Sequence, residues 1–377
     1  MILELTGRCN LRCGYCVYNE GYELTRNFHN KDMSKEVAKA AIDYTKEHAS
    51  DDIAITFYGG ESLVKFDLLK WSIEYAKEVM KDKKQLKFSF ITNLTLVTEE
   101  IANYLATVDN LSIVGSLDGP KDIQNSYRKY VGGRGTFDDA IRGLRYLVEA
   151  LKKNPTNNIA INSVFTPPYT YEKLDEINEF FNSLEWLPKS TDIQIGYANE
   201  GSVDDKEHLL NLARDERYIE DGRLVNTIWA WENRKFKEYR DFNEKDKEDV
   251  GVIEVFKELS FIHNRSILRE PNDVYFFNGC CVPGSRRLYI DTKGDFYICE
   301  RIGEYPSIGN IFNGIDFKSL KENYINGYEE KSLKECSKCW AIRLCGVCYC
   351  GSYNKNGFNL ESKNMICESN RAASEAA

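Results

Sequence analysis

Apolar positions follow two alternating periods over the first 200 residues. Short apolar and β-branched runs such as Ile53–Tyr58 alternate with longer stretches, such as Phe137–Val148, in which apolar residues recur every three or four positions. The first pattern predicts strands and the second predicts amphipathic helices. Six strands are expected, at Ile2–Leu5, Ile53–Tyr58, Leu86–Thr92, Leu111–Ser116, Asn158–Val164 and Asp192–Tyr197.

Five helical stretches separate these strands, and Thr98 is the expected N-cap of the third. The alternation predicts a parallel α/β sheet with right-handed crossovers. In such folds, ligands bind at the loops that leave the carboxyl ends of strands. Four of these loops carry motifs, so we expect them to meet at one edge of the sheet. The motifs are the cysteine loop, GGE, TN and SLDGP.

The chain has 377 residues, 42% of them hydrophobic and 12% aromatic, which is enough for a large core. A net charge of -9 argues against a nucleic-acid partner, because such binding depends on clustered Lys and Arg. The sequence has no run of about 18 apolar residues and no signal-peptide pattern, so we expect a soluble, cytoplasmic protein without a membrane partner.

Cysteines lie at the two ends of the chain: three of the twelve come by Cys16, and nine from Cys280 onward. In a cytoplasmic protein this favours metal or redox chemistry. Cys9, Cys13 and Cys16 form a CxxxCxxC array. Three thiolates can bind a four-iron cluster and leave one iron open. The alternative is a zinc site, for which His29 is the nearby fourth ligand.

Two further motifs suit an amino-acid ligand. Gly59 and Gly60 allow close backbone approach, and the carbonyl groups with Glu61 are acceptors for an ammonium group, although a tight turn would explain GGE equally. Ser116 and Arg128 suit a carboxylate.

The C-terminal cysteines follow CX12GX4C, from Cys281 to Cys299, and then CX2CX5C, from Cys336 to Cys345. Nine cysteines are too many for one tetrahedral metal, so two more iron-sulfur clusters are the favoured interpretation. Two zinc ribbons are the alternative.

With these motifs in this order, and with RGTF at Arg134–Phe137, the sequence resembles radical S-adenosylmethionine enzymes with a C-terminal SPASM domain. Within them it looks most like maturases that form thioether cross-links in ribosomally made peptides. The resemblance implies a partial (β/α)6 TIM-like barrel at 1–199, a helical bridge at 200–275 and a small cysteine-rich α+β domain at 276–377.

The resemblance also implies the cofactors: S-adenosylmethionine and three 4Fe-4S clusters. Cys9, Cys13 and Cys16 match the ligands of the radical cluster, whose open iron chelates S-adenosylmethionine. Contacts to that cofactor are implied for Tyr15, Gly60, Ser116 and Arg128. One electron cleaves the cofactor to methionine and a 5'-deoxyadenosyl radical, which abstracts a substrate hydrogen.

For the second domain, the resemblance assigns the outer auxiliary cluster to Cys336, Cys339, Cys345 and Cys367. The inner cluster takes Cys281 and Cys299, completed by Cys348 or by Cys350, which flank the position expected from relatives. Cys280 is a further alternative ligand. If Cys280 does not ligate, the inner cluster keeps an open iron for a substrate thiolate.

Glu300 matches the proton acceptor of related sulfatase maturases, so it is a candidate base; a surface carboxylate or an ion pair with Arg301 is the other interpretation. Relatives show His-Asp where this chain has Gln124 and Asn125. Many also carry a leader-binding domain before the barrel, whereas here Met1 adjoins the first strand.

The expected partners are a ribosomally synthesised precursor peptide and an electron donor such as flavodoxin or ferredoxin. An anaerobic sulfatase maturase that makes formylglycine is the rival enzyme. A non-catalytic zinc-ribbon or electron-transfer protein is the rival from another class.

Overall fold

The computed structural model describes residues 1–18, 28–199, 202–220, 222–238, 281–285, 287–302, 305–343, 345–354 and 357–376. The chain forms two compact units. The first contains Met1–Cys9, Val17–Phe88 and Glu270–Ala377; the second contains Asn10–Cys16 and Ser89–Arg269. The boundary after Cys9 divides the CxxxCxxC array, so that Cys9 belongs to the first unit and Cys13 and Cys16 to the second.

The first unit is built on β1 (Ile2–Thr6), a fully buried strand that pairs in parallel with β2 (Asp52–Gly59). On its other side β1 pairs in parallel with β9 (Tyr289–Ile290), and β10 (Phe296–Tyr297) adds to β9 in the antiparallel direction. Residues near the two ends of the sequence therefore share one sheet. Our sequence analysis did not predict the pairing of β1 with β9, because two-residue strands have no detectable periodicity.

Helices α1 (Lys35–His48) and α2 (Phe66–Val79) follow β1 and β2. The Ser34 side chain accepts a hydrogen bond from the Val37 N–H and so caps α1. Each helix buries one apolar face, with Ile42 and Ile73 fully inaccessible to solvent. The periodicity of the sequence predicted a helical stretch at both places.

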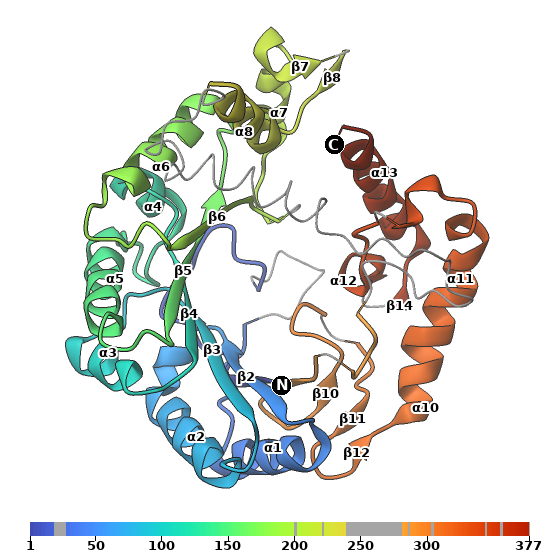
Figure 1. The fold of residues 1–377 in the computed structure, drawn as a ribbon. Helices are drawn as coiled ribbons and strands as arrows, with labels where there is room; N and C mark the ends of the chain where they lie inside the picture. The colour runs from blue at the N-terminus through green and yellow to red at the C-terminus, as the bar shows by residue number, and fades with distance from the viewer. Residues whose placement is uncertain are drawn as a thin grey trace. The chain divides into compact units, whose positions relative to one another are not determined.

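The second unit contains the parallel strands β4 (Leu111–Ser116), β5 (Asn158–Phe165) and β6 (Asp192–Tyr197). β3 (Gln85–Thr92) begins in the first unit and ends in the second. Helices α3, α4, α5 and α6 lie along the outer side of β4, β5 and β6 (Figure 1). Their bounds are Glu99–Ala106, Lys121–Tyr127, Phe137–Leu151 and Tyr171–Ser183.

All six predicted strands are confirmed, each within a residue or two, and Thr98 caps α3 by accepting from the Ile101 N–H. The helix α4 was missed, because its seven residues are too few to display a period. It begins directly after SLDGP and ends just before Arg128, so it sets the distance between those two motifs.

After β6 come α7 (Lys206–Leu212), a 3-10 turn (Glu216–Tyr218), the two-residue strands β7 (Ile219–Glu220) and β8 (Arg223–Leu224), and α8 (Thr227–Glu238). Trp231 on α8 is fully buried, and its Nε1–H donates to Asp175 Oδ1 at 2.9 Å. The rest of the predicted bridge, Cys280 and the Phe236 side chain lie outside the described residues.

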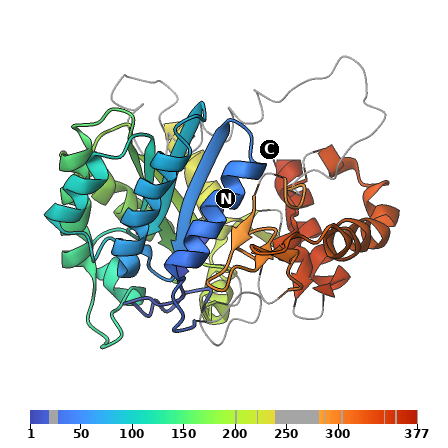
Figure 2. The same ribbon diagram turned by 90° about the horizontal axis from the view of Figure 1, so that it is seen from below.

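The C-terminal residues form short elements joined by irregular segments (orange to red in Figure 2). Tyr324, Tyr349 and Tyr353 pack together in their core. In the described part of the chain, no helix is long and apolar enough to cross a membrane. The elements are β11 (Gly309–Asn310), β12 (Gly314–Ile315), α10 (Phe317–Leu320), a π-helix (Lys321–Asn326), α11 (Gly327–Cys336), a 3-10 helix (Trp340–Arg343), α12 (Tyr349–Ser352), β13 (Tyr353–Asn354), β14 (Gly357–Phe358) and α13 (Leu360–Ala376).

Candidate functional site

The loop that carries Cys13 and Cys16 is fixed by backbone hydrogen bonds to the segment after α4. Arg12 N–H donates to Lys129 O at 2.8 Å, and Gly14 N–H donates to Tyr127 O at 2.9 Å. Leu11, which is 1% exposed, forms a β-bridge with Tyr130. The backbone around Arg128 therefore positions the two thiols, a connection that the linear sequence does not reveal.

The TN motif at the end of β3 holds the same loop by its side chains. Asn93 Nδ2 donates to Asn10 Oδ1 at 2.8 Å, and Asn10 Nδ2 donates to Thr95 Oγ1 at 2.9 Å. Thr95 in turn donates to Asn93 Oδ1 through both its backbone N–H and its hydroxyl group. This closed network shows that TN supports the cysteine loop.

Tyr15, Asp118 and Arg128 form a buried cluster. Arg128 Nη1 donates to the Tyr15 hydroxyl at 2.6 Å, and that hydroxyl donates to Asp118 Oδ2 at 2.7 Å. The three residues are 8%, 1% and 6% exposed. Arg128 Nε is also buried, without a hydrogen-bond partner among the described residues. The Nε–H group of Arg128 is thus available to donate to a carboxylate, the group that this guanidinium is predicted to bind.

The electrostatics of this cluster are dominated by burial. Burial raises the pKa of Asp118, against the opposing effects of Arg128 and Tyr15. Burial lowers the pKa of Arg128, but the charges of Tyr15, Cys13 and Asp118 outweigh it, and the pKa lies well above its usual value. Arg128 therefore keeps its positive charge in this buried site.

Gln124 and Asn125, where relatives show His-Asp, support the neighbouring motifs. Gln124 Oε1 accepts from Asp118 N–H at 2.8 Å, and its Nε2 donates to Thr136 Oγ1 at 3.2 Å. Asn125 Oδ1 accepts from the N–H groups of Thr136 and Phe137 at 2.7 and 3.0 Å. The two amides therefore join SLDGP to RGTF, which answers what these residues do in this chain.

In the first unit, the GGE segment follows β2 and lies against the backbone that leads into Cys9. Gly60 N–H donates to Thr6 O, and Glu61 N–H donates to Arg8 O, each at 2.9 Å. A Cβ atom at Gly59 would lie 2.1 Å from Thr6 O, and one at Gly60 would lie 2.4 Å from Arg8 O. Only glycine permits this approach.

Glu61 is 2% exposed, and its Oε1 accepts from Leu63 N–H at 3.1 Å, which caps the 3-10 helix Ser62–Lys65. The carboxylate thus has a structural bond in addition to the role in ammonium binding that the sequence predicted. Arg8 makes a bidentate pair with Asp32, with Nε–Oδ1 at 2.9 Å and Nη2–Oδ2 at 2.6 Å. This pair fixes the residue next to Cys9.

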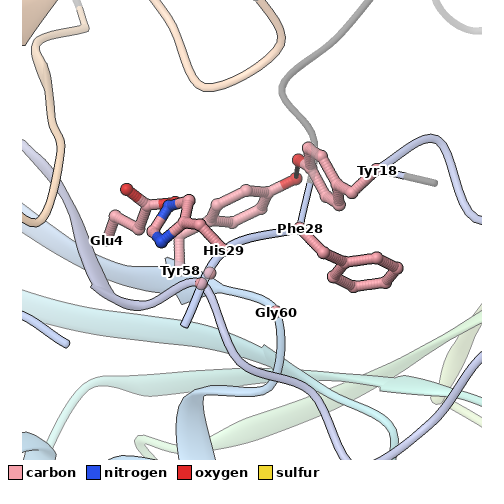
Figure 3. A pocket seen from close by; sticks show the side chains of 8 residues that line it. Glu4, Tyr18, Phe28, His29, Tyr58 and Gly60 are labelled. Carbon is pink, nitrogen blue, oxygen red and sulfur yellow. Dashed lines mark hydrogen bonds and ion pairs between the residues drawn. The ribbon is translucent and has the colours of Figure 1, made fainter. Parts of the chain in front are cut away.

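A small cavity of about 10 Å³ adjoins the glycines and is lined by both of them and by Glu4, Gly7, Tyr18, Phe28, His29 and Tyr58. The hydroxyl groups of Tyr18 and Tyr58 hydrogen-bond to each other, and His29 lies beside Glu4 (Figure 3). A volume of this size holds about one water molecule. His29 Nε2 lies 3.3 Å from Glu4 Oε1, so the histidine proposed as a zinc ligand has a carboxylate partner.

Four cysteines of the C-terminal domain line one cavity of about 60 Å³: Cys336, Cys339, Cys345 and Cys367. They are the four residues that the family resemblance assigns to the outer auxiliary cluster. Four thiols around one enclosed space are the donor set that a four-iron cluster requires. These residues therefore fit the expected group.

Lys363 is buried in the same cavity, at 1% exposure, and its Nζ donates to Cys367 Sγ at 3.6 Å. Burial lowers the pKa of Lys363, but the charges of Cys336 and Cys367 outweigh it, so that the pKa is raised. The sequence analysis did not single out Lys363. The available signal was its position four residues before Cys367, one helical turn away.

Cys299, Cys348 and Cys350 lie near one another. Cys350 Sγ donates to Arg301 O at 3.4 Å, and Arg301 N–H donates to Cys299 Sγ at 3.2 Å. Contact with Cys350 lowers the pKa of Cys348 to about 6. Cys281 is exposed. Among the described residues, no three His, Cys, Asp or Glu side chains are arranged to hold a single metal ion.

Glu300 forms an ion pair with Arg287, with Oε1 and Nη1 3.0 Å apart, and its side chain is 14% exposed. It is therefore a largely buried carboxylate with a cationic partner from the segment before β9. The sequence analysis named Arg301 as the possible partner and did not consider Arg287.

Comparisons with known proteins agree with these features. Residues 3–181 match the Radical SAM superfamily. A serine-type anaerobic sulfatase-maturating enzyme from Bacteroides thetaiotaomicron is 26% identical over 384 residues, which cover 98% of this chain and 86% of the relative.

Two solved structures share the fold. The first is native anSMEcpe with bound AdoMet and a Cp18Cys peptide, at a TM-score of 0.67 and 21% identity, over 98% of this chain and 94% of the other. The second is Streptococcus suis SuiB bound to the precursor peptide SuiA, at 0.56 and 16%, over 96% and 74%. The chain has the partial barrel of these proteins, and residues 3–181 are a radical SAM domain in an enzyme with a SPASM-like C-terminal domain.

Proposed function

We propose that the protein is a peptide maturase that joins a cysteine sulfur to a carbon atom in a ribosomally made precursor peptide. Cys9, Cys13 and Cys16 hold the radical cluster, and Tyr15, Gly59, Gly60, Glu61, Ser116 and Arg128 contact S-adenosylmethionine. When S-adenosylmethionine is bound there, its one-electron cleavage supplies the 5'-deoxyadenosyl radical that removes a hydrogen atom from the substrate. The electron comes from a flavodoxin or ferredoxin.

In this proposal the protein residues orient the cofactor. Arg128 binds the carboxylate through Nε, because Nη1 already donates to Tyr15 and Nε is buried without a hydrogen-bond partner among the described residues. The closely packed Gly59 and Gly60 backbone presents carbonyl groups to the ammonium. Glu300, held by Arg287, is the base that takes the substrate proton.

The observation that carries the thioether assignment is the hydrogen bond from Cys350 Sγ to Arg301 O. A donor keeps its proton, whereas a cluster ligand is a thiolate. This contact favours Cys348 over Cys350 as the third protein ligand, beside Cys281 and Cys299. If Cys280 does not ligate, the inner cluster keeps an open iron that suits a substrate thiolate. Cys280 lies outside the described residues.

The chemistry balances with this arrangement. Thioether formation removes one hydrogen atom from carbon and one proton from the thiol. The remaining electron leaves the substrate for an auxiliary cluster. The product is lighter by two hydrogens and keeps its sulfur.

The test uses the reconstituted full chain with S-adenosylmethionine, dithionite and a cysteine-containing peptide from a neighbouring open reading frame. Mass spectrometry should show a product that is two hydrogens lighter than the substrate peptide and has one free thiol fewer. A matched peptide with Ser in place of Cys should be unchanged. Conversion of both peptides to formylglycine would contradict the thioether assignment. Zinc with little iron, or no 5'-deoxyadenosine, would contradict the whole proposal.

Formylglycine formation is the second candidate. The similarity to the sulfatase-maturating enzyme extends over 98% of this chain, including the cysteine-rich domain. A peptide that models a sulfatase active-site segment with Cys or Ser tests this activity in the same assay.

A further inference from the structure

The side chain of Lys363 occupies an unusual place for a lysine. It is 1% exposed and lies in the cavity lined by Cys336, Cys339, Cys345 and Cys367. Burial of an ammonium group is costly unless it is paired. The Lys363 side chain hydrogen-bonds to thiols of this cavity: Nζ lies 3.6 Å from Cys367 Sγ, and Cys336 is a second partner.

The helix α13 explains how the charge reaches this position. Lys363, Cys367 and Arg371 are spaced four residues apart, so they lie on one face of the helix and all line the cavity. Cys367 therefore has a cationic residue one turn before it and another one turn after it. Of the two, Lys363 is the more deeply buried and the less screened by solvent.

One acidic residue, Glu335, also lines the cavity. It is exposed, so water screens its charge, whereas the buried ammonium acts through a medium of low dielectric constant. The positive charge of Lys363 should therefore dominate the potential at the thiols.

We propose that Lys363 is a positioning residue that raises the reduction potential of the outer auxiliary cluster. Reduction adds one electron, and a buried cation with an N–H···S hydrogen bond stabilises the more negative state. The inference rests on the proposed function in one respect: it requires that the four cysteines hold a cluster. Its consequence is that the outer cluster accepts an electron more readily.

The test is a redox titration followed by electron paramagnetic resonance. The full chain carries Cys9→Ala, Cys13→Ala and Cys16→Ala, so that only the auxiliary clusters contribute. The component that disappears on Cys339→Ser is assigned to the outer cluster. Lys363→Met, Lys363→Gln and Lys363→Arg are compared with Lys318→Met, which removes an exposed lysine from α10.

We expect Lys363→Met and Lys363→Gln to shift the midpoint potential of the outer component downward at unchanged iron content. Lys363→Arg keeps the positive charge, so its midpoint potential should stay close to that of the parent. Lys318→Met should leave the potential unchanged. An unchanged potential in fully loaded Lys363→Met, or loss of the cluster from all three Lys363 variants, would overturn the tuning role. Absence of a component sensitive to Cys339→Ser in the parent would instead refute the outer cluster itself.

Discussion

Arg128 donates a hydrogen bond to the hydroxyl group of Tyr15 across 2.6 Å. Tyr15 lies between two of the array cysteines, and Arg128 follows the fourth strand, so the bond joins two motifs that are 113 positions apart. Because the Tyr15 hydroxyl also donates to Asp118, it lies between the two buried side chains and hydrogen-bonds to both.

Tyr15→Phe should therefore destabilise the protein. Removal of the hydroxyl leaves Asp118 and Arg128 buried without this partner, which costs about 1–3 kcal/mol for hydrogen bonds to charged groups. Urea unfolding of the cluster-free protein measures the loss, and binding of S-adenosylmethionine to the reconstituted protein should weaken with it. Tyr127→Phe, a change to a neighbouring tyrosine, is the control. Equal stabilities of the two variants would contradict the role of the hydroxyl.

Gly60→Ala should be poorly tolerated. The new Cβ atom would lie 2.4 Å from Arg8 O, so the backbone beside Cys9 would have to move. We expect a free energy of unfolding lower by about 1–3 kcal/mol, as for overpacked sites, together with weaker binding of S-adenosylmethionine. Gly132→Ala has open space around its Cβ position and should change stability by at most about 1 kcal/mol. A Gly60→Ala protein as stable as this control would show that close approach is not required.

Asp32→Asn should change how stability depends on pH. Partial burial raises the pKa of Asp32, but hydrogen bonds from Arg8 and Thr6 outweigh it, and the pKa is lowered. A carboxyl group with a depressed folded-state pKa stabilises the protein above its unfolded-state value of about 3.9, and the contribution is lost as pH falls through the folded-state pKa.

Both partners of this pair are partly exposed, so we expect a loss of about 1 kcal/mol or less at pH 7. The difference from the unsubstituted protein should shrink below about pH 4. Urea unfolding between pH 3 and pH 7 measures it. Asp51→Asn, which removes the acid of an exposed pair with Lys84, is the control. A difference that stays constant with pH would exclude ionisation of Asp32 as its cause.

Cys348→Ala and Cys350→Ala should separate the two candidate ligands of the inner cluster. Because Cys350 donates to Arg301 O, we expect Cys350→Ala to retain the cluster and Cys348→Ala to lose one cluster's worth of iron and sulfide. Anaerobic reconstitution with iron and sulfide analysis gives the answer. The reverse pattern would assign Cys350 as the ligand and remove the support for an open iron. Cys339→Ser, in the outer set, shows the loss expected for a true ligand.

The periodicity of the sequence determined the six strands and five of the helices between them. Each of these elements buries its own apolar face, so its type follows from local pattern. The spacing of Cys336, Cys339 and Cys345 likewise predicted a metal-binding set, because the ligands of such a site are close in sequence. Cys367 was added by resemblance to a family, and the cavity lined by all four agrees.

Only the tertiary structure decided the contacts between residues distant in sequence. It paired β9 with β1, brought Arg128 to Tyr15, gave Gln124 and Asn125 their roles between SLDGP and RGTF, and placed Lys363 among the thiols. These contacts depend on how packed elements approach each other, for which a single sequence carries no periodic signal. The sequence shows that residue 363 is a lysine and therefore cationic. The burial of Lys363, and hence its effect on the thiols, depends on the fold.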